Sequence, residues 1–200
     1  MTYAQLKTDI ANWTERDDLS LKIPTFISLC EAEIRRDVRV RNQETAADLT
    51  IASGSADLPT GFIEIRRLYL DSANNYPLHY MSPEVLWDSA GISGSGEAYG
   101  YTIEGQTIKF LPESATGTAK LLYIKAFDAL TDDTDTNWLL DNVYDIYLYG
   151  SLKHTYVYIE DNDNALKYDG LYKQSVEKLN RMDNWGRTGP NMQRYGGITP

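Results

Sequence analysis

The sequence is poor in the residues that carry most metal and nucleophilic chemistry. Among 200 residues there is one cysteine, Cys30, and there are two histidines, His79 and His154. A single cysteine excludes an intrachain disulfide, and no Cys/His spacing typical of a zinc site occurs. Neither histidine belongs to a recognisable Ser-His-Asp arrangement. We therefore expect no metal, no cofactor and no catalytic residue.

Basic residues and long apolar runs are also scarce. The chain has 19 Lys and Arg against 29 Asp and Glu, a net charge of −10. General binding to nucleic acids needs clustered Lys and Arg, so sequence-specific nucleic-acid binding is not expected. No charged-then-apolar signal opens the chain, and no apolar run is long enough to span a membrane. These absences predict a soluble protein made in a cytoplasm, with no membrane partner.

Apolar side chains at helical spacing occur at both ends of the chain and predict four helices. Thr2 and Gln5 have the spacing of a capping box, and Pro24 suits the first turn of the second helix. Cys30 lies within the apolar stripe of that helix, which predicts a small core residue. The predicted helices span residues 2–16, 24–41, 137–159 and 165–182.

The third predicted helix contains five tyrosines and alternates like a strand over 144–148. Its apolar period extends over about twenty residues, which is too long for an ordinary strand and favours a helix. Gly150 on the inner side would allow a close helix approach. Five tyrosines exceed what one buried stripe holds, so we expect Tyr149 and Tyr156 to face away from the core. The predicted inner side comprises Leu139, Val143, Ile146, Gly150 and Val157.

Between the helices the hydrophobic period changes to two, as in half-buried strands. Ile63, Ile65 and Tyr69 alternate with polar residues, and 101–112 predicts a hairpin that turns near Glu104 and Gly105. The fold class is therefore α+β. It has a helical core formed by the N- and C-terminal helices, an inserted antiparallel β-rich lobe at about 43–127, and an extended C-terminal tail.

Residues 1–183 are expected to form a single domain, and 184–200 a flexible tail. The tail contains four Gly, two Pro and no apolar periodicity, so it cannot bury enough surface to order itself. It nevertheless carries aromatic and basic residues that suit folding on a partner. These are Trp185, Arg187, Arg194 and Tyr195.

Two segments resemble ligand sites without fulfilling their requirements. The glycine-rich loop 91–96 lacks the Lys-Ser/Thr of a phosphate loop. The acidic stretch 133–144 begins like a calcium loop but has Trp138 and Tyr144 where Gly and Glu are needed. We expect Asp135 or Thr136 to cap the following helix instead. Basic residues at the end of the second helix suit its negative C-terminal pole, or a surface that faces a neighbouring subunit or DNA. These are Arg35, Arg36, Arg39 and Arg41.

Five stretches, taken in order, resemble the head-to-tail adaptor proteins of short-tailed phages. They are 18–39, 58–71, 77–88, 101–112 and 137–180, and the last, which includes "YDIYLYG", is the most telling. The chain departs from the resemblance at Val143-Tyr144, where such proteins often have Pro.

The resemblance implies a virion protein of the neck that forms a twelve-subunit ring on the portal protein. Its outer end would dock the tail nozzle protein, and genome DNA would pass through its channel. On this reading, the four named tail residues bind the portal. The intersubunit candidates are Tyr149, Tyr156, Arg35, Arg36 and Arg39. No catalysis is implied, and an acidic subunit with an unbound tail should be monomeric when isolated.

Two other functions remain compatible with the residues. Exposed Tyr and Trp on the β-rich lobe would suit a module that binds glycans or proteins. A hydrolase would need two carboxylates that face one cleft.

Overall fold

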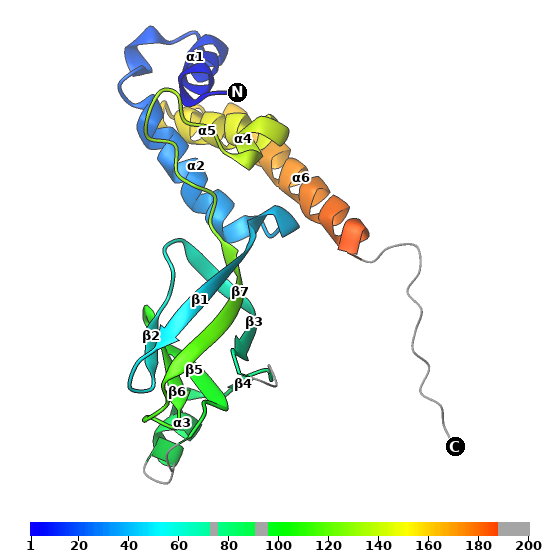
Figure 1. Cartoon of the computed structure of the whole chain (residues 1–200). Coiled ribbons are helices and arrows are strands. Elements are labelled where there is room, and N and C mark those ends of the chain that lie inside the picture. The colour runs from blue at the N-terminus through cyan, green and yellow to red at the C-terminus, as the bar shows by residue number, and fades with distance from the viewer. Residues whose placement is uncertain (73–75, 91–95, 188–200) are drawn as a thin grey trace, which may run out of the picture. The chain divides into compact units, whose positions relative to one another are not determined.

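The computed structural model describes residues 1–72, 76–90 and 96–187 (Figure 1). The chain forms two compact units, one of Met1–Asn42 with Phe127–Pro200 and one of Gln43–Ala126. We call them the helical unit and the β unit. The second coincides closely with the β-rich lobe predicted at about 43–127. The α+β fold class is confirmed, with the β unit inserted between the N- and C-terminal helices.

Helix α5 is the centre of the helical unit. It contacts α1, α2, α4 and α6, so it is buried on several sides and not along one stripe. Its buried residues include Ile146, Tyr147, Leu148, Ser151 and Leu152. The helices are α1 (Tyr3–Thr14), α2 (Ile23–Asp37), α4 (Trp138–Asn142), α5 (Tyr144–Tyr158) and α6 (Asn162–Arg187), with short 3₁₀ helices at Asp17–Leu19 and Arg41–Gln43.

The predicted caps and core of the first two helices are largely confirmed. Thr2 and Gln5 form the capping box of α1, and Cys30 is fully buried in α2. Helix α2 ends at Asp37, four residues before the predicted end. Val38 and Val40 are both buried at strand-like spacing, and Val38 is extended, which takes the backbone out of the helix.

The predicted helix 137–159 is two helices. Val143 leaves the helical region, with φ −139° and ψ 58°, at the position where the resembled proteins often have Pro. Asn137 caps α4 by accepting a hydrogen bond from the Leu140 amide, so the prediction of Asp135 or Thr136 was wrong. The Asp135 carboxylate instead accepts hydrogen bonds from the amides of Asp132 and Thr131, which lower its pKa.

Helix α6 is longer than predicted. It begins at Asn162 and ends at Arg187. The Asp161 side chain, just before its first residue, accepts a hydrogen bond from the Asn164 amide. The predicted tail 184–200 therefore starts too early. Val157, which was expected to face inward, is exposed.

The described part of the β unit contains two sheets that share a core, and one helix that contacts β5 and β6. One sheet has the order β1-β7-β3 and is antiparallel; the other has the order β2-β6-β5-β4, in which only β4 and β5 are parallel. Leu49, Leu68, Phe110 and Leu121 belong to the common core. The elements are β1 (Glu44–Ile51), β2 (Ser55–Asp57), β3 (Phe62–Leu70), β4 (His79–Tyr80), α3 (Pro83–Ala90), β5 (Gly100–Glu104), β6 (Thr107–Leu111) and β7 (Gly117–Lys125).

Strand β3 reverses its inward face along its length. The pairing with β7 shifts between Phe62 and Glu64 and again between Ile65 and Arg67. Each irregularity changes which side chains point inward. Leu68 and Leu70 are buried, whereas Tyr69, which was predicted to share a face with Ile63 and Ile65, is not. The β5–β6 hairpin was predicted correctly, and Gly105 in its turn has a φ of +61°.

Candidate functional site

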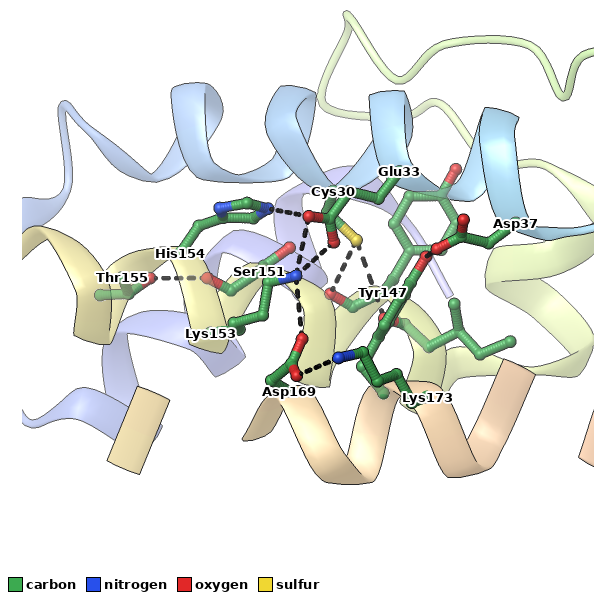
Figure 2. A network of polar contacts seen from close by, with 12 residues as sticks. Cys30, Glu33, Asp37, Tyr147, Ser151, Lys153, His154, Thr155, Asp169 and Lys173 are labelled. Carbon is green, nitrogen blue, oxygen red and sulfur yellow. Dashed lines mark hydrogen bonds and ion pairs between the residues drawn. The ribbon is translucent and has the colours of Figure 1, made fainter. Parts of the chain in front are cut away.

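An ion-pair network joins the three long helices of the helical unit. Figure 2 shows Lys153 of α5 between Glu33 of α2 and Asp169 of α6. Its Nζ lies 2.6 Å from Glu33 Oε2 and 3.3 Å from Asp169 Oδ1. The Lys153 side chain is 14% exposed. The two carboxylates compensate the charge of this part-buried cation and link α5 to α2 and to α6.

His154 lies at the edge of this network. Its Nε2 is 3.5 Å from Glu33 Oε1, a salt bridge only when the ring is protonated. Burial lowers the pKa of His154, and Lys153 and Arg36 lower it further, against the opposing effect of Glu33. While the imidazole is neutral, its contact with Glu33 is therefore not a salt bridge.

Each of the five tyrosines of the predicted helix 137–159 has a partner within the helical unit. The Tyr144 hydroxyl lies 2.5 Å from Asp9 Oδ2, and the Tyr147 hydroxyl lies 2.8 Å from Asn137 Nδ2. Tyr158 packs near Phe26. The premise of a single buried stripe was wrong, because α5 contacts helices on several sides.

Tyr149 and Tyr156 belong to an aromatic cluster with Trp13 of α1 and Tyr168 of α6. The Tyr156 and Tyr168 rings stack with centroids 5.2 Å apart, and Trp13 meets Tyr149 and Tyr168 edge-on. Both tyrosines are half-buried, and Trp13 is 48% exposed. The cluster therefore ties α5 to α1 and α6, and it leaves Trp13 at the surface. An intersubunit role for the two tyrosines stays a prediction.

A cavity of about 440 Å³ lies in the β unit between α3 and the β5–β6 hairpin. Leu86 and Phe110 supply apolar walls, and Trp87, Glu104 and Glu113 supply an aromatic ring and two carboxylates. The Trp87 Nε1–H donates to Glu104 Oε1 at 2.8 Å. Within the described residues, no group of three or more His, Cys, Asp and Glu could hold a metal ion.

A comparison with protein-family models places the chain in a known family. The model of the SU10 adaptor protein family matches residues 1–194. The chain belongs to this family. A comparison with curated proteins found no significant match. Membership identifies the protein as a phage head-to-tail adaptor and a component of the virion neck, as the resemblance implied. Among the helices that the structure describes, none is long and apolar enough to cross a membrane.

The basic residues at and beyond the end of α2 have favourable positions or contacts inside the helical unit of the adaptor. Arg35 and Arg36 lie in the last turn of α2, where positive charge is favourable. Arg39 lies beyond the helix and its Nη1 donates to the carbonyls of Arg35 and Val38. Arg41 pairs with Asp183 of α6 at 3.0 Å. The helix-terminus interpretation is supported for this cluster, and intersubunit contact by Arg35, Arg36 and Arg39 stays a prediction.

The four tail residues predicted to bind the portal fall into two groups. Trp185 and Arg187 lie in the last turns of α6. Arg194 and Tyr195 lie outside the residues that the structure describes. The backbone of the first pair therefore belongs to a continuous helix and not to a loose segment.

Sequence reasoning missed two sites in the adaptor. The partners of Lys153, Glu33 and Asp169, are 120 and 16 residues away, so no local spacing announces them. The cavity beside Trp87 depends on the hairpin that packs against α3, and no local spacing announces this contact.

Proposed function

We propose that twelve copies of the adaptor form a ring between the portal protein and the tail nozzle protein, with genome DNA passing through the channel. The match of the family model to residues 1–194 carries this proposal. The net charge of −10 fits a channel that DNA crosses without sticking, because phosphates bind Lys and Arg and not carboxylates.

Ring formation is supported by apolar side chains that the helical unit leaves exposed. A subunit in a ring needs two different surfaces, one for each neighbour. Leu21, Leu29 and Leu166 come from three separate segments of this unit and are all exposed. They are better candidates for such contacts than Tyr149 and Tyr156, which already pack against Tyr168. Repulsion between acidic copies keeps the isolated subunit monomeric until the portal supplies a template.

Attachment to the portal by the C-terminal segment is supported by the length of α6. Among the side chains of α6 that the structure describes, Val176 is the last buried apolar one, and the helix continues for eleven more residues to Arg187. At 1.5 Å per residue this extension is about 16 Å long. It is held near its middle by the pair between Arg41 and Asp183.

Two truncations test the portal attachment. Removal of 184–200 should abolish co-sedimentation with the cognate portal ring and leave the circular dichroism spectrum and melting temperature of the adaptor unchanged. Removal of 188–200 alone separates the roles of the two residue pairs. Retained attachment would assign it to Trp185 and Arg187, and lost attachment to Arg194 and Tyr195. Full attachment by the 184–200 truncation would exclude the C-terminal segment from the interface.

We also propose that the adaptor is a structural protein without catalytic activity. Family membership supports this role, and Glu104, one of the two carboxylates in the cavity, already accepts the Trp87 indole N–H. Release of reducing ends from host surface polysaccharide by the purified adaptor, lost in Glu104→Gln, would contradict the proposal.

A further inference from the structure

We propose that the cavity between α3 and the β5–β6 hairpin binds an arginine side chain from an extended segment of a partner protein. The inference goes beyond ring formation and portal attachment, because it concerns residues of the β unit alone. It rests on the shape of the cavity, on an exposed indole in its wall and on the charge of its rim.

The cavity is a built feature of the β unit. Buried Leu86 and Phe110 line it, so its base is apolar and fixed. Gly54 on one side has a φ of +65°, and a Cβ there would lie 2.6 Å from the Glu113 carbonyl oxygen. Its amide donates to the Ala115 carbonyl, and its own carbonyl accepts from the Phe110 amide. These bonds hold the segment that carries Glu113 against the hairpin.

Trp87 offers a flat aromatic surface at the mouth of the cavity. The Trp87 side chain is 69% exposed, whereas the preceding residue of α3, Leu86, is buried. The hydrogen bond from Nε1 to Glu104 fixes the orientation of the ring. A fixed, exposed indole beside a carboxylate binds cations through the negative face of its π system.

The charge of the rim selects a cation. Glu104 and Glu113 line the cavity against one Lys109. Glu84 and Asp88 lie on α3, on either side of Trp87 in the sequence, and both are exposed. A guanidinium can stack on the indole and meet a carboxylate with a planar fork, which an ammonium cannot do. The surroundings therefore favour arginine in the partner segment.

Titration of the full chain with a small peptide tests this site. The probe is acetyl-Gly-Arg-Gly-Arg-Gly-amide, and the readout is the indole N–H resonance of Trp87, assigned with Trp87→Phe. We expect a saturable shift that weakens as salt is added, because the rim charges are exposed to solvent. The same peptide with citrulline in place of arginine keeps the shape and removes the charge, and it should give no saturable shift.

Variants distinguish binding at the cavity from a general attraction of the peptide to an acidic protein. Glu113→Gln should weaken peptide binding about threefold, as expected for one exposed charge pair. Trp87→Ala, followed through the hairpin amides, should weaken it about tenfold. Glu64→Gln on β3, outside the cavity, removes the same charge and should have no effect. Equal binding of the citrulline peptide would overturn the proposal. So would a saturable shift with a neutral oligosaccharide such as tri-N-acetylchitotriose but not with the arginine peptide, and that result would assign the cavity to glycans.

Discussion

Gly150 of α5 lies against the thiol of Cys30 of α2. A Cβ at Gly150 would overlap Cys30 Sγ and would lie 3.2 Å from Cδ2 of the Tyr172 ring. Real Cβ atoms do not approach a sulfur atom as closely as the first contact requires. The glycine therefore allows α2, α5 and α6 to meet at one point, as expected from the sequence. Cys30 is buried where these helices meet, and this burial raises the pKa of its thiol.

Gly150→Ala should destabilise the adaptor by about 1–2 kcal/mol. Alanine gains about 1 kcal/mol in helix propensity over glycine. Overpacking against a buried sulfur and a buried ring costs about 1–3 kcal/mol, and the contact is close enough to lie near the upper end. Urea unfolding followed by circular dichroism measures the difference.

Two variants provide the controls for this substitution. Gly170 lies in α6, and a Cβ there would meet nothing within 4 Å, so Gly170→Ala should stabilise the protein by about 0.5–1 kcal/mol. Cys30→Ala should recover part of the loss in Gly150→Ala, because it removes the sulfur. A Gly150→Ala protein as stable as Gly170→Ala would show that the helices do not meet closely at this point.

Lys153→Met should destabilise the protein by about 3 kcal/mol. The substitution preserves length and leaves Glu33 and Asp169 facing each other without the cation between them. Lys120→Met is the matched control, since Lys120 pairs with Asp71 on an exposed surface and should change stability by less than about 1 kcal/mol. A similar loss of stability in the two variants would mean that the ion pairs of Figure 2 contribute little to the stability of the helical unit.

Acidification should weaken the fold in part through His154. Its pKa is below 6.5 in the folded protein, chiefly because of burial, and near 6.5 in the unfolded chain. The unfolded chain therefore binds the proton more readily. The stability that follows from a neutral His154 is present above pH 6.5 and is lost as the pH falls through 6.5 to the folded pKa.

The measurement is the free energy of unfolding between pH 7.5 and 5.5. His154→Gln should show a smaller decline than the parent protein, and His79→Gln should retain the decline. Parallel curves for the parent and His154→Gln would contradict the assignment to His154.

The sequence predicted elements whose signal is local. The stripe of α2 around Cys30, the capping box of α1 and the hairpin turn at Gly105 each depend on a few neighbouring residues, and all were confirmed. The end of α2 was misplaced because buried valines at Val38 and Val40 follow a strand-like spacing that continues the apolar pattern. At this position the burial of the two valines in the tertiary structure, and not the helical period of the sequence, determines where the helix ends.

Other features depend on contacts between distant segments and were not predictable. The inward face of β3 reverses at irregularities that appear only in its pairing with β7. The sequence analysis found more tyrosines in α5 than one buried face could hold, because it assumed a single inner face. In the structure four helices contact α5. The cavity beside Trp87 required α3 to pack on a hairpin that follows it in the chain.

Leu166→Glu should impair ring assembly and leave the subunit folded. Leu166 is 72% exposed on α6, so the change removes an apolar contact with a neighbouring copy at little cost to the monomer. We expect at least a tenfold smaller fraction of complete rings on the portal by native mass spectrometry. Gln174→Glu adds the same charge to the same helix and serves as the control. Normal rings from Leu166→Glu would place Leu166 outside the intersubunit surface.

Native mass spectrometry of the adaptor with and without the cognate portal ring tests the central claim most directly. Alone, the protein should have the mass of one 22.7 kDa chain. With the portal in limiting amount, the complex should gain the mass of twelve such chains, and partial rings should be rare because each subunit contacts two neighbours. A portal that never gains a ring-sized mass, at any ratio of the two proteins, would contradict the assignment of this chain as a ring-forming adaptor.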